Sequence, residues 1–133
     1  MQGLNNGIPK QVLIIIHSNE RSFHMNKFEL FCLLFYALDA QWDETKNEDL
    51  GNYLSGANPF LFSDMGSAVP DCYENFCRVV GDENIDLEDS YRTAENYVMT
   101  LGITAVEEAF KNTSEQQWCT AAKKYLSAPH KGA

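Results

Sequence analysis

Nine consecutive apolar residues, Leu30 to Leu38, limit how this chain folds more than any other feature of its sequence. The run is too short to cross a membrane as a helix, which needs about 20 residues. Asn26, followed three residues later by Glu29, forms a capping-box pattern in front of it. Because no polar face interrupts the run, we expect one helix from Asn26 to about Trp42 that is buried on most of its surface.

Further helix signals follow, and no stretch after Met25 alternates between apolar and polar residues as a half-buried strand does. Asp86 is expected to cap a helix, and the polar stretch from Asp43 to Glu48 is expected to be a linker. Ser114 with Gln117 either starts a new helix or interrupts a long one. Proline, glycine and capping residues delimit predicted helices at residues 48–54, 70–80 and 86–101, and from 104 onward. The sequence therefore predicts an all-α fold, a single compact domain of five or six helices.

The first 24 residues do not share this helical pattern. They contain a β-branched run, Val12 to Ile16, which forms either a short strand or part of a disordered tail. Arg21-Ser22 can also be encoded by AGG-AGY, the purine tract of a bacterial ribosome-binding site. In a bacterial chain this pattern predicts that Met25 is the initiator and that the preceding segment is not part of the natural protein. The expected divisions are an N-terminal extension at residues 1–24, an acidic helical domain at 25–127 and a flexible tail at 128–133.

The charge of the chain disfavours one class of function. The 133 residues carry a net charge of −9, and from Met25 onward 8 Lys and Arg stand against 18 Asp and Glu, a net charge of −10. Nucleic-acid binding through phosphate neutralisation is therefore disfavoured. The region from Asp39 to Glu95 holds 14 acids and only three basic residues. This asymmetry either keeps molecules apart in solution, which is the simpler interpretation, or steers a basic partner toward the domain.

Cysteine and histidine do not form the pattern of a metal site or a nucleophilic pair. The cysteines contain no C-x-x-C pair and lie in apolar helical patterns, as small buried residues do in a reducing cytosol. The segment from Asp82 to Asp89 begins like a calcium loop but has Leu87 where that loop needs glycine. We therefore expect neither a cofactor nor a metal. Acids flanking the apolar run also argue against a secretory signal, so we expect a cytoplasmic protein.

Two parts of the sequence are candidate binding surfaces. The loop from Gly56 to Asp71 is rich in aromatic residues, so either Phe60 and Phe62 fill the core between helices, the simpler interpretation, or the loop binds a partner. The paired acids on either side of Lys46 are expected to be solvated, which makes them poor general acids or bases. The residues that we predict to contact a partner are Asp43, Glu44, Glu48, Asp49, Phe60, Phe62, Asp64, Met65, Asp82 and Glu83.

These features predict a non-enzymatic domain that binds another protein, basic in character, or a second copy of itself. The role would be that of an inhibitor, an immunity-like protein or an adaptor. We expect neither nucleic acid nor membrane as a partner. The alternative is a small-molecule or divalent-cation site, with or without catalysis, built from carboxylates near Asp64 and Asp71.

Overall fold

Helices form most of the structure, as the sequence predicts. The structure, a computed structural model, describes residues 23–60, 66–81 and 84–127. Within these residues there are six helices and one two-stranded antiparallel sheet, so the predicted all-α domain is confirmed. In chain order the elements are β1 (His24–Met25), α2 (Lys27–Thr45), α3 (Glu48–Ala57), α4 (Pro70–Val80), β2 (Ile85–Asp86), α5 (Leu87–Leu101), α6 (Thr104–Lys111) and α7 (Glu115–Ser127).

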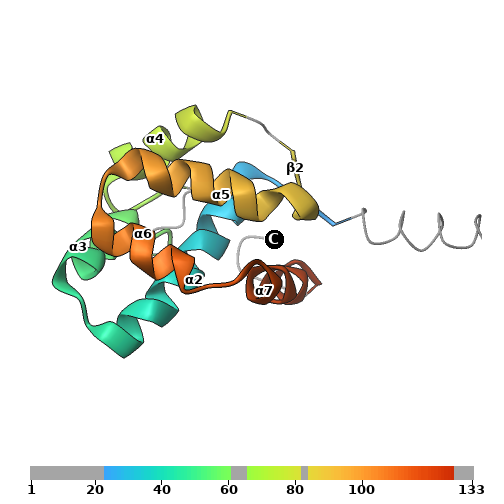
Figure 1. Ribbon diagram of the computed structural model, residues 1–133. Coiled ribbons are helices and arrows are strands. Elements are labelled where there is room, and N and C mark those ends of the chain that lie inside the picture. The colour runs from blue at the N-terminus through green and yellow to red at the C-terminus, as the bar shows by residue number, and fades with distance from the viewer. Residues whose placement is uncertain (1–22, 61–65, 82–83, 128–133) are drawn as a thin grey trace, which may run out of the picture.

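Helix α2 runs through the centre of the fold (Figure 1). Five consecutive residues, from Leu30 to Leu34, are buried. Since an α-helix makes one turn in about 3.6 residues, neighbours cover α2 on every side at this level. Over its whole length, α2 contacts all five other helices of the described residues and strand β1. The predicted burial of the first helix on most of its surface is therefore found along this stretch.

Reciprocal side-chain caps begin two of the helices. At the start of α2, the Asn26 side chain accepts a hydrogen bond from the Glu29 N–H at 2.8 Å. The Glu29 carboxylate accepts one from the Asn26 N–H at 2.9 Å, which completes the predicted capping box. Ser114 and Gln117 form the same reciprocal pair in front of α7. A new helix therefore begins there, and the two alternatives left open by the sequence are resolved.

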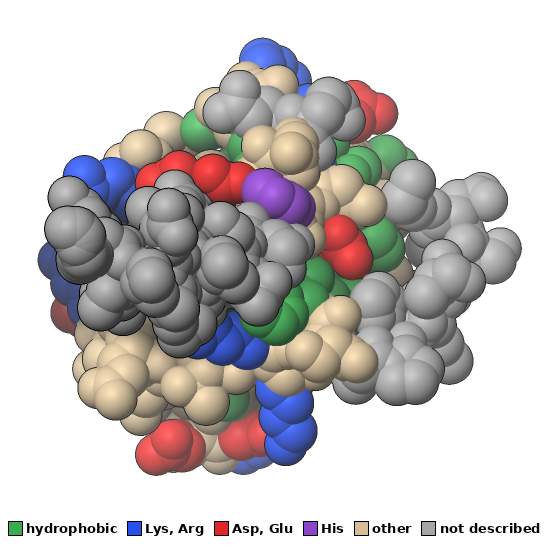
Figure 2. Space-filling view, turned by 90° about the vertical axis from the view of Figure 1, so that its right-hand side faces the viewer, with side chains coloured by type: hydrophobic (Ala, Val, Ile, Leu, Met, Phe, Trp, Pro, Cys, Tyr) green, Lys and Arg blue, Asp and Glu red, His purple; other side chains and the backbone are tan. Residues whose placement is uncertain are grey.

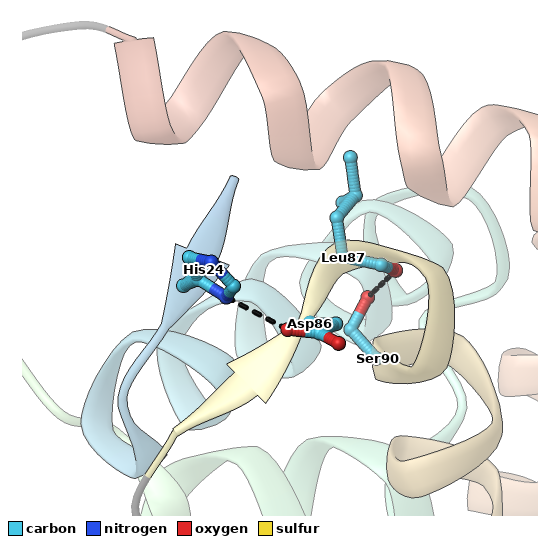
Figure 3. A network of polar contacts seen from close by, with 4 residues as sticks. All are labelled: His24, Asp86, Leu87 and Ser90. Atoms are coloured by element: carbon cyan, nitrogen blue, oxygen red, sulfur yellow. Dashed lines mark hydrogen bonds and ion pairs between the residues drawn. The ribbon is translucent and has the colours of Figure 1, made fainter. Parts of the chain in front are cut away.

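Asp86 is the N-cap residue of α5, as predicted, but its side chain makes no capping hydrogen bond. The Asp86 carboxylate pairs instead with the His24 ring, with 2.7 Å between Oδ1 and Nδ1 (Figure 3). The first turn of α5 is tied to α7 through Ser90. Its hydroxyl donates to the Leu87 carbonyl at 2.7 Å and accepts the indole N–H of Trp118 at 2.8 Å.

The first residues that the structure describes are joined to the start of α5. Met25 is buried, and its strand pairs with β2. The Leu87 N–H donates to the Phe23 carbonyl at 3.1 Å, so packing includes the two residues before Met25. The strand predicted within residues 12–16 lies outside the described residues. The start at Met25 and the proposed domain divisions stay predictions.

Leu38→Ala should lower the free energy of unfolding by about 2–5 kcal/mol, because truncation of a fully buried side chain leaves a cavity. Val79→Ala, on α4, is a matched control. Val79 is 38% exposed, and the loss there should stay near 0.5 kcal/mol or below. Urea unfolding followed by circular dichroism measures both variants. Equal losses would contradict the central position of α2.

A chain that begins at Met25 should be less stable than one that begins at Phe23, by about 1–2 kcal/mol. The shorter chain lacks the carbonyl that accepts the Leu87 N–H and the half-exposed contact of the His24 ring with the Asp86 carboxylate. Thermal unfolding of the two chains, the longer one with methionine in place of Ser22, makes the comparison. If their melting temperatures coincide, the contacts before Met25 do not stabilise the fold.

Candidate functional site

The corner between α2 and α3 is tighter than the sequence suggests. Helix α2 continues through Thr45, so the linker predicted from Asp43 to Glu48 is wrong, and only Lys46 and Asn47 separate the two helices. Lys46 has a φ of 52°, and its N–H donates to the Trp42 carbonyl at 2.7 Å, which ends α2. Asn47 then caps α3 with its side chain. With a separation of only two residues, these backbone conformations set the direction of α3 relative to α2.

A hollow of about 490 Å³ lies between α2 and α3 at this corner. The Trp42 indole packs closely against α3, because a Cβ atom at Gly51 would lie only 2.8 Å from Trp42 Nε1. Glycine at this position therefore lets the indole approach the helix backbone, and one wall of the hollow is aromatic. The residues that line the hollow are Phe35, Asp39, Trp42, Lys46, Glu48, Gly51, Asn52, Leu54, Ser55 and Asn58.

Lys46 places its ammonium group over the Trp42 ring. Its Nζ is 4.0 Å from the ring centre, a distance typical of a cation–π contact. The same Nζ is 3.7 Å from Oδ1 of Asp43. The side chains of Lys46 and Asp43 are 61% and 67% exposed, so solvent screens both contacts and each is weak. The corner thus already holds one cation against an indole, and the chain itself supplies it.

The predicted acids at residues 43, 44, 48 and 49 all lie at this corner and are exposed. Asp43 and Glu44 are in the last turn of α2, and Glu48 and Asp49 are in the first turn of α3. The structure adds Asp39, which lines the hollow with Glu48 and was not among the predicted site residues. Two other predicted residues, Asp82 and Glu83, lie outside the described residues.

Phe60 lies beside the corner on the surface of α2, so the simpler interpretation that places it in the core is wrong. Its ring centre is 5.6 Å from that of Phe35 and 5.2 Å from that of Tyr36. Phe60 is 44% exposed and Tyr36 is 49% exposed. Because Phe35 also lines the hollow, the exposed aromatic pair adjoins it. The remaining predicted residues of this loop, Phe62, Asp64 and Met65, lie outside the described residues.

The alternative site near Asp64 and Asp71 is described only in part. Asp71 is exposed in the first turn of α4, whereas Asp64 falls outside the described ranges. The Ser67 hydroxyl, which belongs to the same loop, donates to the Val69 carbonyl and accepts the Tyr73 N–H at 3.0 Å. It therefore serves the start of α4. In the part of the chain that the structure describes, no three Cys, His, Asp or Glu residues are grouped to hold a metal ion.

Burial raises the pKa of several cysteine thiols and tyrosine hydroxyls. It raises the pKa of the Cys32 thiol to about 12, and it also raises the pKa of Cys72 and Cys119. The hydroxyls of Tyr53 and Tyr97 share a hydrogen bond of 2.7 Å, and burial raises the pKa of both. Since the thiolate is the nucleophilic form of cysteine, a raised pKa makes these three thiols poor nucleophiles near neutral pH.

Comparison with known proteins reveals no relative: no family model, no curated protein and no solved structure matches the chain. The fold and the corner together define a small all-helical domain with an exposed surface that combines aromatic rings and carboxylates. Of the helices in the described ranges, none has both the length and the apolar character required to cross a bilayer.

In the folded chain, Cys32 should react with a thiol reagent near pH 8 slowly, at the rate at which local opening of the fold exposes its side chain. Its side chain is buried and its pKa of about 12 leaves almost no thiolate. Cys77, which is partly exposed on α4, should react much faster. Kinetics with Ellman's reagent separate the two thiols, and Cys32→Ala should remove only a slow phase. Rapid labelling of Cys32 in folded protein would contradict this picture.

Proposed function

We propose that this domain is a non-enzymatic binding module that recognises a basic protein through the corner between α2 and α3. The observation that carries the proposal is the exposed pair of Tyr36 and Phe60 beside a strongly acidic stretch. From Asp39 to Asp49 the chain has five acids and one lysine. Aromatic anchors bordered by charged residues are typical of protein interfaces. An inhibitor or adaptor would act through this binding alone.

Helix stability does not account for the acids at the end of α2. The C-terminal end of a helix carries partial negative charge, so carboxylates there are unfavourable by about 0.3–1 kcal/mol each. Asp43 and Glu44 occupy such positions, whereas Glu48 and Asp49 stand in the favourable first turn of α3. All four nevertheless concentrate negative charge at one corner. This placement supports a role for Asp43 and Glu44 in binding.

Charge and aromatic surface would contribute to binding in different ways. The carboxylates attract a basic partner over roughly one Debye length, about 8 Å at physiological salt, and so raise the association rate. Tyr36 and Phe60 lose their remaining exposed surface when the partner docks, which slows dissociation. Binding should therefore weaken as salt is added, mainly through slower association.

Charges of both signs mix on another side of the molecule. Figure 2 shows the side that lies to the right in Figure 1, where acidic and basic side chains alternate with apolar and uncharged groups around the grey atoms. The start of α5 is on this side, far from the corner where α2 meets α3 (Figure 1). Acids of α5 therefore offer a control for the loss of charge alone.

Neutralising the corner should abolish capture of the partner from a native lysate of the source organism. The bait is the full chain, compared with a variant carrying Asp43→Asn, Glu44→Gln, Glu48→Gln and Asp49→Asn, and with a second variant carrying Tyr36→Ala and Phe60→Ala. We expect one basic protein to be enriched by the unchanged chain and lost from both variants, because attraction and anchoring are both required. Quantitative mass spectrometry measures the enrichment.

The matched control removes four acids elsewhere, with Glu88→Gln, Asp89→Asn, Glu95→Gln and Glu115→Gln, and should retain the partner. Loss of the partner from this control as well would reduce the effect to net charge and contradict the proposal. If only the chain itself is recovered and light scattering gives the mass of a dimer, the domain binds a second copy of itself and not a different protein.

A further inference from the structure

The hollow between α2 and α3 is lined by groups that suit a positive charge. One wall is the Trp42 indole, and Asp39 and Glu48 line the same hollow. An indole face and carboxylates are the two kinds of group that hold guanidinium and ammonium ions in proteins. The hollow, of about 490 Å³, is open to solvent, so a side chain of a docked protein can enter it.

Lys46 provides a second and independent observation. Its ammonium already lies over the indole, 4.0 Å from the ring centre, so this ring accepts a cation in the geometry that the corner imposes. The ammonium comes from the chain itself and not from an added ion. The contact therefore shows that a cation fits over this ring.

We infer that the hollow binds one lysine or arginine side chain of the partner, whose charged end takes the place of the Lys46 ammonium over Trp42. This inference rests on the proposed function, because the basic partner supplies that side chain. Asp39 and Glu48 would accept hydrogen bonds from the incoming cation. Lys46 is then an internal competitor that the partner displaces.

The contacts of the Lys46 side chain are weak enough to be displaced. Its Nζ stays 3.7 Å from the nearest oxygen of Asp43, beyond the usual 2.7–3.2 Å of an N–H···O hydrogen bond (about 2.9 Å is most common). The end of α2 is fixed by the Lys46 backbone N–H and not by its side chain. The side chain can therefore swing into solvent while the corner keeps its shape.

Removal of the Lys46 charge should strengthen the binding of a basic peptide. The probes are two short fluorescein-labelled peptides, one of alternating arginine and serine and one of alternating lysine and serine, titrated with the full chain and followed by anisotropy. Lys46→Gln should lower the Kd about two- to fivefold, the equivalent of one exposed cation–π contact. The peptide that binds more tightly identifies the preferred cation, guanidinium or ammonium.

Matched variants separate this effect from net charge. Lys124→Gln removes the same charge on α7 and should leave the Kd nearly unchanged. Asp39→Asn, Glu48→Gln and Trp42→Phe should each raise the Kd, whereas Glu88→Gln should not. Emission from Trp42 should also change when peptide is added to the unchanged chain, while Trp118, which is buried, supplies a constant background. Circular dichroism checks that each variant remains folded.

Two results would overturn the inference: equal effects of Lys46→Gln and Lys124→Gln, or unchanged binding by folded Trp42→Phe. Either would be distinguishable from failure of the proposed function. A partner that still depends on Tyr36 and Phe60 for capture would leave the binding module intact and remove only the cation site. If partner capture also does not depend on Tyr36 and Phe60, the proposed binding module is contradicted as well.

Discussion

The apolar stretch of α2 has no polar face, and the rest of the structure depends on how that stretch is covered. Leu30 to Leu34 span more than one helical turn, so apolar side chains have to meet the helix from all directions. The Phe76 ring of α4 packs against the Phe31 ring of α2, with 4.9 Å between ring centres, and against the Tyr97 ring of α5, with 4.8 Å. A helix of this kind is stable in water only inside a shell. The arrangement of α3 to α7 around α2 follows from that requirement.

The candidate site lies where α2 extends beyond the residues that cover its apolar stretch. From Asp39 to Asp49 no residue is buried, whereas Leu38, directly before this stretch, is fully buried. The buried residues of this continuous helix therefore end at Leu38, and the residues after it are only partly buried or exposed. Because a helix is stiff, the packing of the first half fixes where Trp42 and its neighbouring carboxylates lie. The corner is thus held in place without help from a partner, and such preorganisation favours binding.

Local signals in the sequence predict more of this structure than contacts between distant segments. The cap at Asn26 needs only a residue three positions away, so it can be recognised from spacing alone. The pairing of Asp86 with His24 depends on how β1 meets β2, and no local pattern contains that information. The approach of Trp42 to Gly51 likewise requires the angle between two helices. The sequence therefore pointed to the acids of the corner and to Phe60, but not to Tyr36, Asp39 or Trp42, and not to the geometry that brings them together.

Lys46 connects the folding of the corner with its proposed binding. Of the residues with described backbone, it is the one non-glycine residue with a positive φ. This conformation costs a residue with a Cβ about 1–2 kcal/mol, a cost that Gly102 avoids at the end of α5. The contact with Trp42 returns only about 0.5–1 kcal/mol at an exposed site. A cation at the C-terminal end of α2 also gains about 0.3–1 kcal/mol from the helix dipole, so the interactions of the Lys46 side chain offset much of the backbone cost. The same cation covers the Trp42 indole, and it is the group that a basic partner would displace in the proposed binding.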